Sequence, residues 1–298
     1  MTAAVSARAR LAAAGLDDEQ VTRLVDAALA EDLAGGQDIT SVATVPARAE
    51  ATARFVARAD GVVAGLDVVE LVLARASDGR LRCRALARDG ESVTAGQALL
   101  EAAGPARDLL LAERTALNLL CHLSGVATAT RRWADALEGT TAVIRDTRKT
   151  TPGLRSLEKY AVRCGGGSNH RMGLSDMALV KDNHVAAAGG VTEAYRRVRE
   201  LVATIPVEIE VDSLDGLREA IAAGADEVLI DNFRPEEMRA AVRLRDELGP
   251  AVRIEASGGL SVDSARTVAE TGVDFIAVGE LTHSARVLDI GLDLRAVR

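Results

Sequence analysis

The sequence contains no run of 18 apolar residues, although 48% of its 298 residues are hydrophobic. A transmembrane helix needs about 20 such residues in succession, so we expect no membrane span. The alanine-rich start carries Arg8 and Arg10 but lacks the compact block of large apolar residues that a secretory signal requires. Length and composition therefore predict a globular cytoplasmic protein with a large core and two domains.

Cysteine is scarce, and its spacing excludes the usual metal and disulfide frameworks. Cys83, Cys121 and Cys164 lie far apart, and none belongs to a CxxC pair or to a histidine cluster at zinc spacing. We expect reduced, mostly buried thiols. The sequence also has no Walker A motif, and no GxGxxG follows its first predicted strand. Neither a P-loop nor a dinucleotide-binding fold is therefore expected.

Lysine is nearly absent, because only Lys149, Lys159 and Lys181 among the 36 basic residues are lysines. In a chain that prefers arginine so strongly, a lysine indicates a position that needs a compact ammonium group. Lys181 follows the apolar run MALV, so we expect a desolvated charge that is paired or functional. Lys159 lies in an amphipathic stretch, where we expect an ordinary surface position.

Positive charge is concentrated in one segment of an acidic chain. The formal net charge of −8 and the pI near 5.2 argue against a general nucleic-acid binder. Residues 145–181 nevertheless carry eight basic and three acidic residues, so this segment is +5 and the remainder is −13. The stretch RDTRKTTPGLR at 145–155 therefore predicts a site for a small anion.

The first half mixes helices with short strands. Asp17 and Asp18 precede residues 19–32, whose apolar spacing predicts a capped helix. Alternation and turn glycines predict strands within residues 51–65, and residues 107–136 predict two helices separated at Gly125. Residues 89–104 predict a hairpin similar to that of biotinyl and lipoyl carrier domains. Residues 1–148 contain no lysine to modify, which argues against carrier function.

The second half alternates short apolar strands with helices at a regular interval. Polar residues recur where the strands end, and the steps between Glu210, Asp231, Ser257 and Gly279 are 21, 26 and 22 residues. Repeated βα units of this length are typical of a parallel sheet. Because barrel enzymes build their active sites at the carboxyl ends of their strands, these polar ends favour an α/β barrel.

The strand ends are expected to form one rim with a cationic side and an acidic side. Arginine binds a carboxylate through two parallel hydrogen bonds, and lysine provides a point charge for carboxylate or phosphate. Glu210 and Asp231 are suited to bind Mg²⁺ or ribose hydroxyls. The SGG turn at 257–259, which precedes a predicted helix, is suited to bind phosphate. Ion pairs, helix caps and a plain turn are the structural alternatives. The predicted rim contains Arg148, Lys149, His170, Arg171, Lys181, Glu210, Asp231, residues 257–259 and Gly279.

Residues 146–184, DTRKTTPGLRSLEKYAVRCGGGSNHRMGLSDMALVKDNH, closely resemble the signature of the quinolinate phosphoribosyltransferase family. Further similar segments are EDLAGGQDITS at 31–41, ERTALNLLCHLSGVAT at 113–128, EIEVDSLD at 208–215, LIDNF at 229–233, EASGG at 255–259 and VGELTHSARVLDIGLD at 278–293. The resemblance therefore covers nearly the whole chain.

The resemblance implies a fold and an assembly. Residues 1–125 would form an N-terminal α/β sandwich, residues 126–280 the α/β barrel of the type II phosphoribosyltransferases, and residues 281–298 a segment that returns to the N-terminal domain. It also implies a homodimer, or a higher assembly of dimers, in which the N-terminal domain of one subunit covers the barrel mouth of the other.

The resemblance further implies roles for individual residues. Those for substrate are Arg114, delivered across the dimer interface, and Thr147, Arg148, Lys149, His170, Arg171 and Lys181. The catalytic residues would be Lys149, Lys181, Glu210 and Asp231, of which the two acids would hold Mg²⁺ directly or through water. Phosphate would bind at Ser257, Gly258, Gly259, Val278, Gly279, Glu280 and His283. Glu280 departs from the family pattern, where a small residue is expected. No organic cofactor is implied.

The activity implied by the resemblance is transfer of the phosphoribosyl group of 5-phosphoribosyl 1-pyrophosphate to quinolinate, with decarboxylation. The products would be nicotinate mononucleotide, pyrophosphate and CO₂, in de novo NAD biosynthesis. Three alternatives remain open: a related phosphoribosyltransferase for another aromatic acid, a Schiff-base lyase that uses Lys181 or Lys149, and a non-catalytic sensor of a pyridine carboxylate. Arg148 with His170 and Arg171 favours a dicarboxylate, and Glu210, Asp231 and the SGG turn argue against a sensor.

Overall fold

The chain forms two compact units, which a computed structural model describes for residues 3–296, with side chains from 7 to 295. Unit 1 comprises the residues up to 129, residues 151–166 and the residues from 284 onward. Unit 2 comprises residues 130–150 and 167–283. Residues 151–166, which the sequence analysis placed in the barrel domain, thus pack with unit 1. No helix in the described residues is long and apolar enough to cross a membrane.

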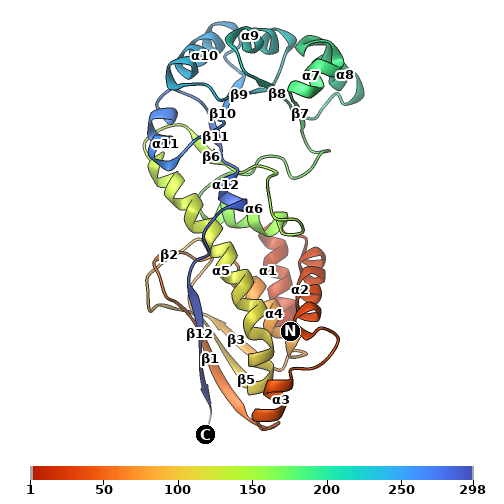
Figure 1. Cartoon of the computed structure of the whole chain (residues 1–298), viewed down its shortest axis with the longest axis vertical. Helices are drawn as coiled ribbons and strands as arrows, with labels where there is room; N and C mark the ends of the chain where they lie inside the picture. The colour runs from red at the N-terminus through yellow and green to blue at the C-terminus, as the bar shows by residue number, and fades with distance from the viewer. Residues whose placement is uncertain (1–2, 297–298) are drawn as a thin grey trace. The chain divides into compact units, whose positions relative to one another are not determined.

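Unit 1 is built on a four-stranded antiparallel sheet in the order β12-β1-β5-β3, with a separate pair of β2 and β4 (Figure 1). Alternate residues of β1 are buried, so one face of the sheet joins the core and the other is exposed. The elements of this unit are α1 (Ala3–Ala13), α2 (Asp18–Leu33), α3 (Ile39–Thr44), β1 (Glu50–Ala57), β2 (Gly61–Val62), α4 (Leu66–Ala76), β3 (Arg82–Ala85), β4 (Ser92–Val93), β5 (Ala98–Pro105), the first part of α5 (Ala106–Ala136), α6 (Arg155–Cys164) and β12 (Ile290–Ala296).

The predicted capped helix is confirmed as α2, because the Asp17 carboxylate accepts hydrogen bonds from the backbone N–H groups of Glu19 and Gln20. The predicted hairpin at 89–104 is wrong, since β4 pairs with β2, and β5 pairs with β1 and β3. The local turn pattern was correct, but long-range pairing decides which strands become neighbours.

The predicted break at Gly125 is also wrong, because α5 runs without interruption from Ala106 to Ala136. A Cβ atom at Gly125 would lie 2.3 Å from the carbonyl oxygen of Arg286 and 2.8 Å from the Cα of Val287. This glycine therefore permits close approach of another backbone segment rather than ending a helix.

Lys159 is completely buried within unit 1, so the predicted surface position is wrong. Its neighbour Glu158 is buried too and accepts hydrogen bonds from His122 Nε2 at 2.8 Å and from the Thr151 backbone N–H at 3.0 Å. An amphipathic pattern predicts a polar face but cannot show that tertiary packing covers that face as well. The three cysteines are free, as predicted, but all three are half-buried rather than mostly buried. Desolvation nevertheless raises the thiol pKa of Cys83 to about 12.

Unit 2 contains a six-stranded parallel sheet in the order β6-β11-β10-β9-β8-β7. Figure 1 shows the strands as an arc with helices α7–α11 on its outer side. This parallel sheet with helices on its outer side confirms the predicted α/β barrel. The elements are β6 (Val143–Arg145), β7 (Ala178–Val180), α7 (Asp182–Ala188), α8 (Val191–Leu201), β8 (Val207–Val211), α9 (Leu214–Ala223), β9 (Glu227–Asp231), α10 (Pro235–Leu248), β10 (Arg253–Ser257), α11 (Val262–Ala269), β11 (Phe275–Ala277) and α12 (Glu280–His283).

The register of the sheet places the polar strand ends at one edge. Ser257 of β10 pairs with Asp231 of β9, and Val211, just after Glu210, pairs with Ile230. All neighbouring strands are parallel, so their carboxyl ends open on the same side of the unit. The apolar residues between them, such as Ile209, Ile230 and Ile254, are buried and form the core.

Candidate active site

A cavity of about 420 Å³ lies at the carboxyl ends of the strands of unit 2. It brings together nine of the predicted residues, from the loop that follows β6, from residues 170–171, and from the ends of β7 to β10. They are Thr147, Arg148, Lys149, His170, Arg171, Lys181, Glu210, Asp231 and Ser257. Leu179, Leu229, Glu255 and Ala277 complete the lining and were not predicted.

An adjoining cavity of about 270 Å³ collects the predicted phosphate-binding residues. It shares five residues with the first cavity, namely Thr147, Lys149, Asp231, Ser257 and Ala277. The residues that it adds are Gly258, Gly259, Leu260, Val278, Gly279, Glu280 and His283. The two cavities therefore form adjacent compartments, one lined by arginine and the other by glycine-rich backbone.

The first compartment has a cationic wall. Burial lowers the pKa of the Arg171 guanidinium, and the nearby charge of Arg148 lowers it further. Within the described residues, no carboxylate lies within 4 Å of the Arg171 guanidinium, which donates instead to the backbone oxygen of Met177 at 3.1 Å. Two arginines that repel each other beside a cavity are stabilised when an anion binds between them.

The opposite wall is acidic. Lys181 Nζ forms an ion pair with Glu210, and the Asn232 side-chain amide donates to Asp231 at 2.6 Å. Lys181 is paired, as expected, but its side chain is 46% exposed, so the predicted desolvation of its charge is wrong. The residue directly follows β7, a strand in which only Val180 is buried.

The turn after β10 has a backbone that requires glycine. Gly258 has φ +94°, and a Cβ atom there would lie 2.2 Å from Asn232 Oδ1. Gly259 has φ +60° with no atom within 4 Å of such a Cβ. In the described chain, the backbone N–H groups of Gly258, Gly259 and Gly279 have no protein acceptor. Unpaired amides beside a cavity are suited to a phosphate group.

The loop after β11 closes the second compartment. A Cβ atom at Gly279 would lie 2.9 Å from Lys149 Cδ and 3.2 Å from His283 Nε2, so both side chains pack against this glycine. The Val278 backbone N–H donates to the Arg145 carbonyl at 2.9 Å and is not available to a phosphate. Glu280 is exposed at the start of α12, where its carboxylate reaches solvent.

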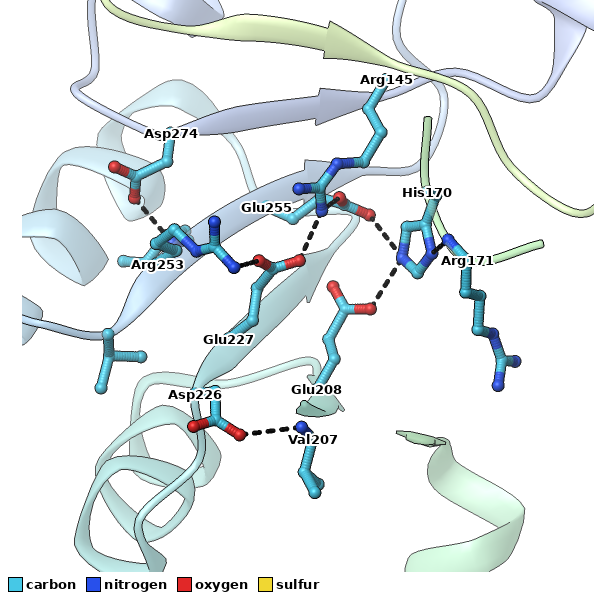
Figure 2. A network of polar contacts seen from close by, with 12 residues as sticks. Arg145, His170, Arg171, Val207, Glu208, Asp226, Glu227, Arg253, Glu255 and Asp274 are labelled. Carbon is cyan, nitrogen blue, oxygen red and sulfur yellow. Dashed lines mark hydrogen bonds and ion pairs between the residues drawn. The ribbon is translucent and has the colours of Figure 1, made fainter. Parts of the chain in front are cut away.

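A buried polar network lies beneath the first compartment (Figure 2). Glu208, Glu227 and Glu255 are completely or almost completely buried. Arg145 Nη1 donates to Glu255 at 2.7 Å and also binds Glu227, while Arg253 lies 3.0 Å from Glu227. The Arg145 guanidinium also stacks 3.4 Å from the centre of the Phe275 ring.

The three buried glutamates lie close enough together to affect one another's protonation. Desolvation raises the pKa of Glu208 to about 8, and the charge of Glu227 contributes. Desolvation, followed by the charge of Glu208, raises the pKa of Glu255 to about 8 as well. One ligand atom from each of these three acids and from His170 lies within 4.8 Å of the others, a spacing that suits a metal ion. Arg145, however, already places a cation among these carboxylates.

The sequence analysis missed this network, although the strands contained a signal. Glu208 and Glu210 are two residues apart in one strand and so face the same side of the sheet, as do residues 255 and 257. Charged residues inside otherwise apolar strands indicate a polar interior layer. We assigned only Glu210 and Ser257, which are nearest the strand ends, to the rim. The sequence pattern does not show how deeply Glu208 and Glu255 are buried.

Arg114 lies elsewhere, exposed on the part of α5 that belongs to unit 1. Unit 1 also has a hollow of about 560 Å³ on the open face of its sheet, larger than either of the two compartments described above. Its arginines are largely paired, since Arg54 and Arg84 bind Glu101, and Arg58 binds Asp293. None of the predicted site residues lines this hollow, so the chemistry points to unit 2.

Comparison with known proteins agrees with this geometry. The N-terminal domain of quinolinate phosphoribosyl transferase matches residues 38–124, and its C-terminal domain matches residues 126–293. The nicotinate-nucleotide pyrophosphorylase (carboxylating) of Mycobacterium leprae (strain TN) is 54% identical over 269 residues, which cover 90% of this chain and 94% of that protein. A probable enzyme of the same name from Bacillus subtilis (strain 168) is 40% identical over 277 residues, covering 92% and 93%.

Solved structures resemble the chain over the same extent. NadC from Streptococcus pyogenes has a TM-score of 0.90 at 38% identity and covers 95% of this chain and 99% of that one. The nicotinate-nucleotide pyrophosphorylase from Francisella tularensis has a TM-score of 0.88 at 38% identity, covering 94% and 98%. Sequence motifs, fold and site geometry agree over both units, and the chain belongs to the quinolinate phosphoribosyltransferase family.

Proposed function

We propose that the chain transfers the phosphoribosyl group of 5-phosphoribosyl 1-pyrophosphate to quinolinate and releases CO₂ and pyrophosphate, giving nicotinate mononucleotide for NAD biosynthesis. The observation that carries this proposal is the cationic wall, where Arg171 faces the cavity beside Arg148 without a carboxylate partner. A ring with two adjacent carboxylates supplies the missing negative charge. The relatives' names support the same substrate.

The chemistry follows from holding two anions in adjacent compartments. The pyridine nitrogen attacks the anomeric carbon as the bond to pyrophosphate breaks. In this proposal Lys149 and Lys181, which line the cavity, bind the negative charge on the donor and acceptor, and Arg148 and Arg171 hold the ring in line. The ring nitrogen then carries a positive charge. When the 2-carboxylate leaves as CO₂, its bonding electrons stay on the ring carbon beside that charge, and a proton from water completes the product.

Glu210 and Asp231 are suited to Mg²⁺, because both carboxylates line the same cavity, next to the compartment assigned to phosphate. Mg²⁺ usually binds one or two carboxylates together with substrate phosphates and water. When bound, it would neutralise charge on the departing pyrophosphate. The ion pair with Lys181 holds the Glu210 carboxylate at the cavity wall.

The remaining expectations complete the proposal. Phosphate binds at residues 257–259 and at Gly279, Glu280 and His283, where free amides and the start of a helix support it. The protein acts in the cytoplasm as a homodimer or an assembly of dimers, and Arg114 reaches the site of the partner subunit. The proposed domains are those given above: residues 1–125, residues 126–280, and residues 281–298 returning to the N-terminal domain.

The test is an incubation of purified protein with 5-phosphoribosyl 1-pyrophosphate, MgCl₂ and either quinolinate or nicotinate, with chromatography of the nucleotide product. We expect product in the incubation with quinolinate and none in the incubation with nicotinate. Product from nicotinate alone would move the substrate to a related phosphoribosyltransferase. Trapping with borohydride in the presence of a carbonyl substrate is expected to leave Lys149 and Lys181 unmodified, since the proposed reaction forms no imine.

A further inference from the structure

Among the described residues, Lys149 is the one cation that lines both compartments of the site. Its side chain packs along the turn after β11, because a Cβ atom at Gly279 would lie 2.9 Å from the Lys149 Cδ. An ammonium group at this place can interact with an anion in either compartment. The position of Lys149 therefore affects how two bound anions lie relative to each other.

The backbone of Lys149 lies in an irregular loop, outside any strand or helix, since β6 ends at Arg145 and α6 begins at Arg155. Two threonine side chains hold it instead. The Thr147 hydroxyl oxygen accepts from the Lys149 backbone N–H at 3.0 Å, and the Thr282 hydroxyl donates to the Lys149 carbonyl at 2.9 Å. The first contact is local to the loop. The second joins the loop to α12, which lies 133 residues further along the chain.

The hydroxyl proton of Thr282 is available for Lys149. The hydroxyl also lies 3.2 Å from the carbonyl oxygen of Gly279. That oxygen already accepts from the backbone N–H groups of Thr282 at 3.2 Å and His283 at 3.5 Å. A hydroxyl has one proton to donate. The Lys149 carbonyl is the nearer acceptor, and it has no other donor within the described part of the chain.

Packing fixes the Thr282 side chain in this orientation. The residue is only 1% exposed, and the neighbouring Leu281 is completely buried, so α12 is held against the core. A β-branched side chain also has few accessible χ1 rotamers. The contact with the carbonyl can therefore transmit the position of α12 to the loop of Lys149.

We propose that Thr282 is a positioning residue, which fastens the loop of Lys149 to α12 and so sets the Lys149 ammonium group between the two compartments. Thr282 lines neither compartment and acts only through Lys149. The identity of the two anions rests on the proposed function, whereas the contact itself does not.

The first test measures binding without turnover. Inorganic pyrophosphate with MgCl₂ is titrated calorimetrically into the wild type, Thr282→Val and Thr282→Ser. Valine keeps the shape of the side chain and removes the hydroxyl, whereas serine keeps the hydroxyl. We expect pyrophosphate to bind about 10-fold more weakly to the valine variant, an effect of the size of one hydrogen bond, and nearly normally to the serine variant. Equal affinity of the wild type and the valine variant, equal weakening in both folded variants, or no binding by the wild type would overturn the proposal.

Steady-state kinetics with quinolinate and 5-phosphoribosyl 1-pyrophosphate provide the second test. Thr271→Val is the matched control, because Thr271 is also buried and its hydroxyl donates to the Val268 carbonyl at 2.6 Å, outside both compartments. Both valine variants should have a lower melting temperature, since each loses one hydrogen bond. Only Thr282→Val should lower kcat/KM for the phosphoribosyl donor, by about 10-fold.

Equal kcat/KM in the two valine variants would show that Thr282 has a purely structural role. An inactive wild-type protein would refute the proposed function, while the pyrophosphate titration would still decide the role of Thr282.

Discussion

At the scale of single residues, Arg171 is the side chain on which the site depends most. Its guanidinium lies at the cavity, repelled by Arg148, and no carboxylate of the described residues lies within 4 Å of it, although Glu208 and Asp176 attract it from further away. We predict that Arg171→Ala lowers kcat/KM for quinolinate about 100-fold, since it removes charge-assisted hydrogen bonds to the substrate. Arg239→Ala, at an exposed position on α10 outside the cavities, is the matched control and should behave like the wild type. Steady-state kinetics of both variants measure this, and near-normal kinetics of Arg171→Ala would remove the residue from the site.

Two adjacent glycines give a second prediction at this scale. Gly258→Ala should destabilise the protein by about 3 kcal/mol or more, because the new Cβ combines left-handed strain with a clash against Asn232. Gly259→Ala meets no atom and should cost only the strain, about 1 kcal/mol. Chemical denaturation of the two variants checks the difference. Equal stability would mean that the turn rearranges easily and is not a rigid phosphate site.

At the scale of elements, Gly125 decides how α5 packs. Alanine is a better helix former than glycine by about 1 kcal/mol, so a helix considered alone predicts that Gly125→Ala is stabilising. The structure predicts the opposite, because the added atom would lie 2.3 Å from a backbone carbonyl that cannot turn away. A lower melting temperature is expected, and an unchanged or higher one would show that residues 286–287 can move without cost.

The elements also show what the sequence reveals and where it stops. The βα interval predicted the parallel sheet, and the polar strand ends predicted eight residues that meet in one cavity, to which the family resemblance added Thr147. Both follow from periodicity, which is local information. The continuous α5 and the partners of β4 depend on contacts between distant segments, so local turn signals gave the wrong result. Lys159 was misplaced for the same reason, since nothing in its own helix reveals what covers it.

At the scale of the whole molecule, the buried glutamates couple stability to pH. Glu255 has a folded-state pKa of about 8 and a reference value of 4.5. Between these values the folded protein holds a proton that the unfolded chain releases, so this contribution to stability is lost as the pH rises through 8. We predict that Glu255→Gln, which cannot ionise, gains stability relative to the wild type as the pH rises from about 5 to about 8. Melting temperatures of both proteins across this range measure the effect, and parallel curves would contradict the raised pKa.

The charge of the whole chain places its activity in one part of the fold. An acidic protein concentrates its lysines and a surplus of arginine within residues 145–181, and the structure gathers five of these cationic or histidine side chains around one cavity. The sequence predicted this anion site because charge is visible without coordinates. It did not reveal the buried acids below, whose effect depends on depth and desolvation.

The most direct test of the account is to follow quinolinate labelled with carbon-14 in its 2-carboxylate, with 5-phosphoribosyl 1-pyrophosphate and MgCl₂. Labelled CO₂, nicotinate mononucleotide and pyrophosphate should appear in equal amounts, and omission of the phosphoribosyl donor should abolish CO₂ release. Release of CO₂ without the donor, or formation of a nucleotide that retains the label, would contradict the coupling of phosphoribosyl transfer to decarboxylation at this site.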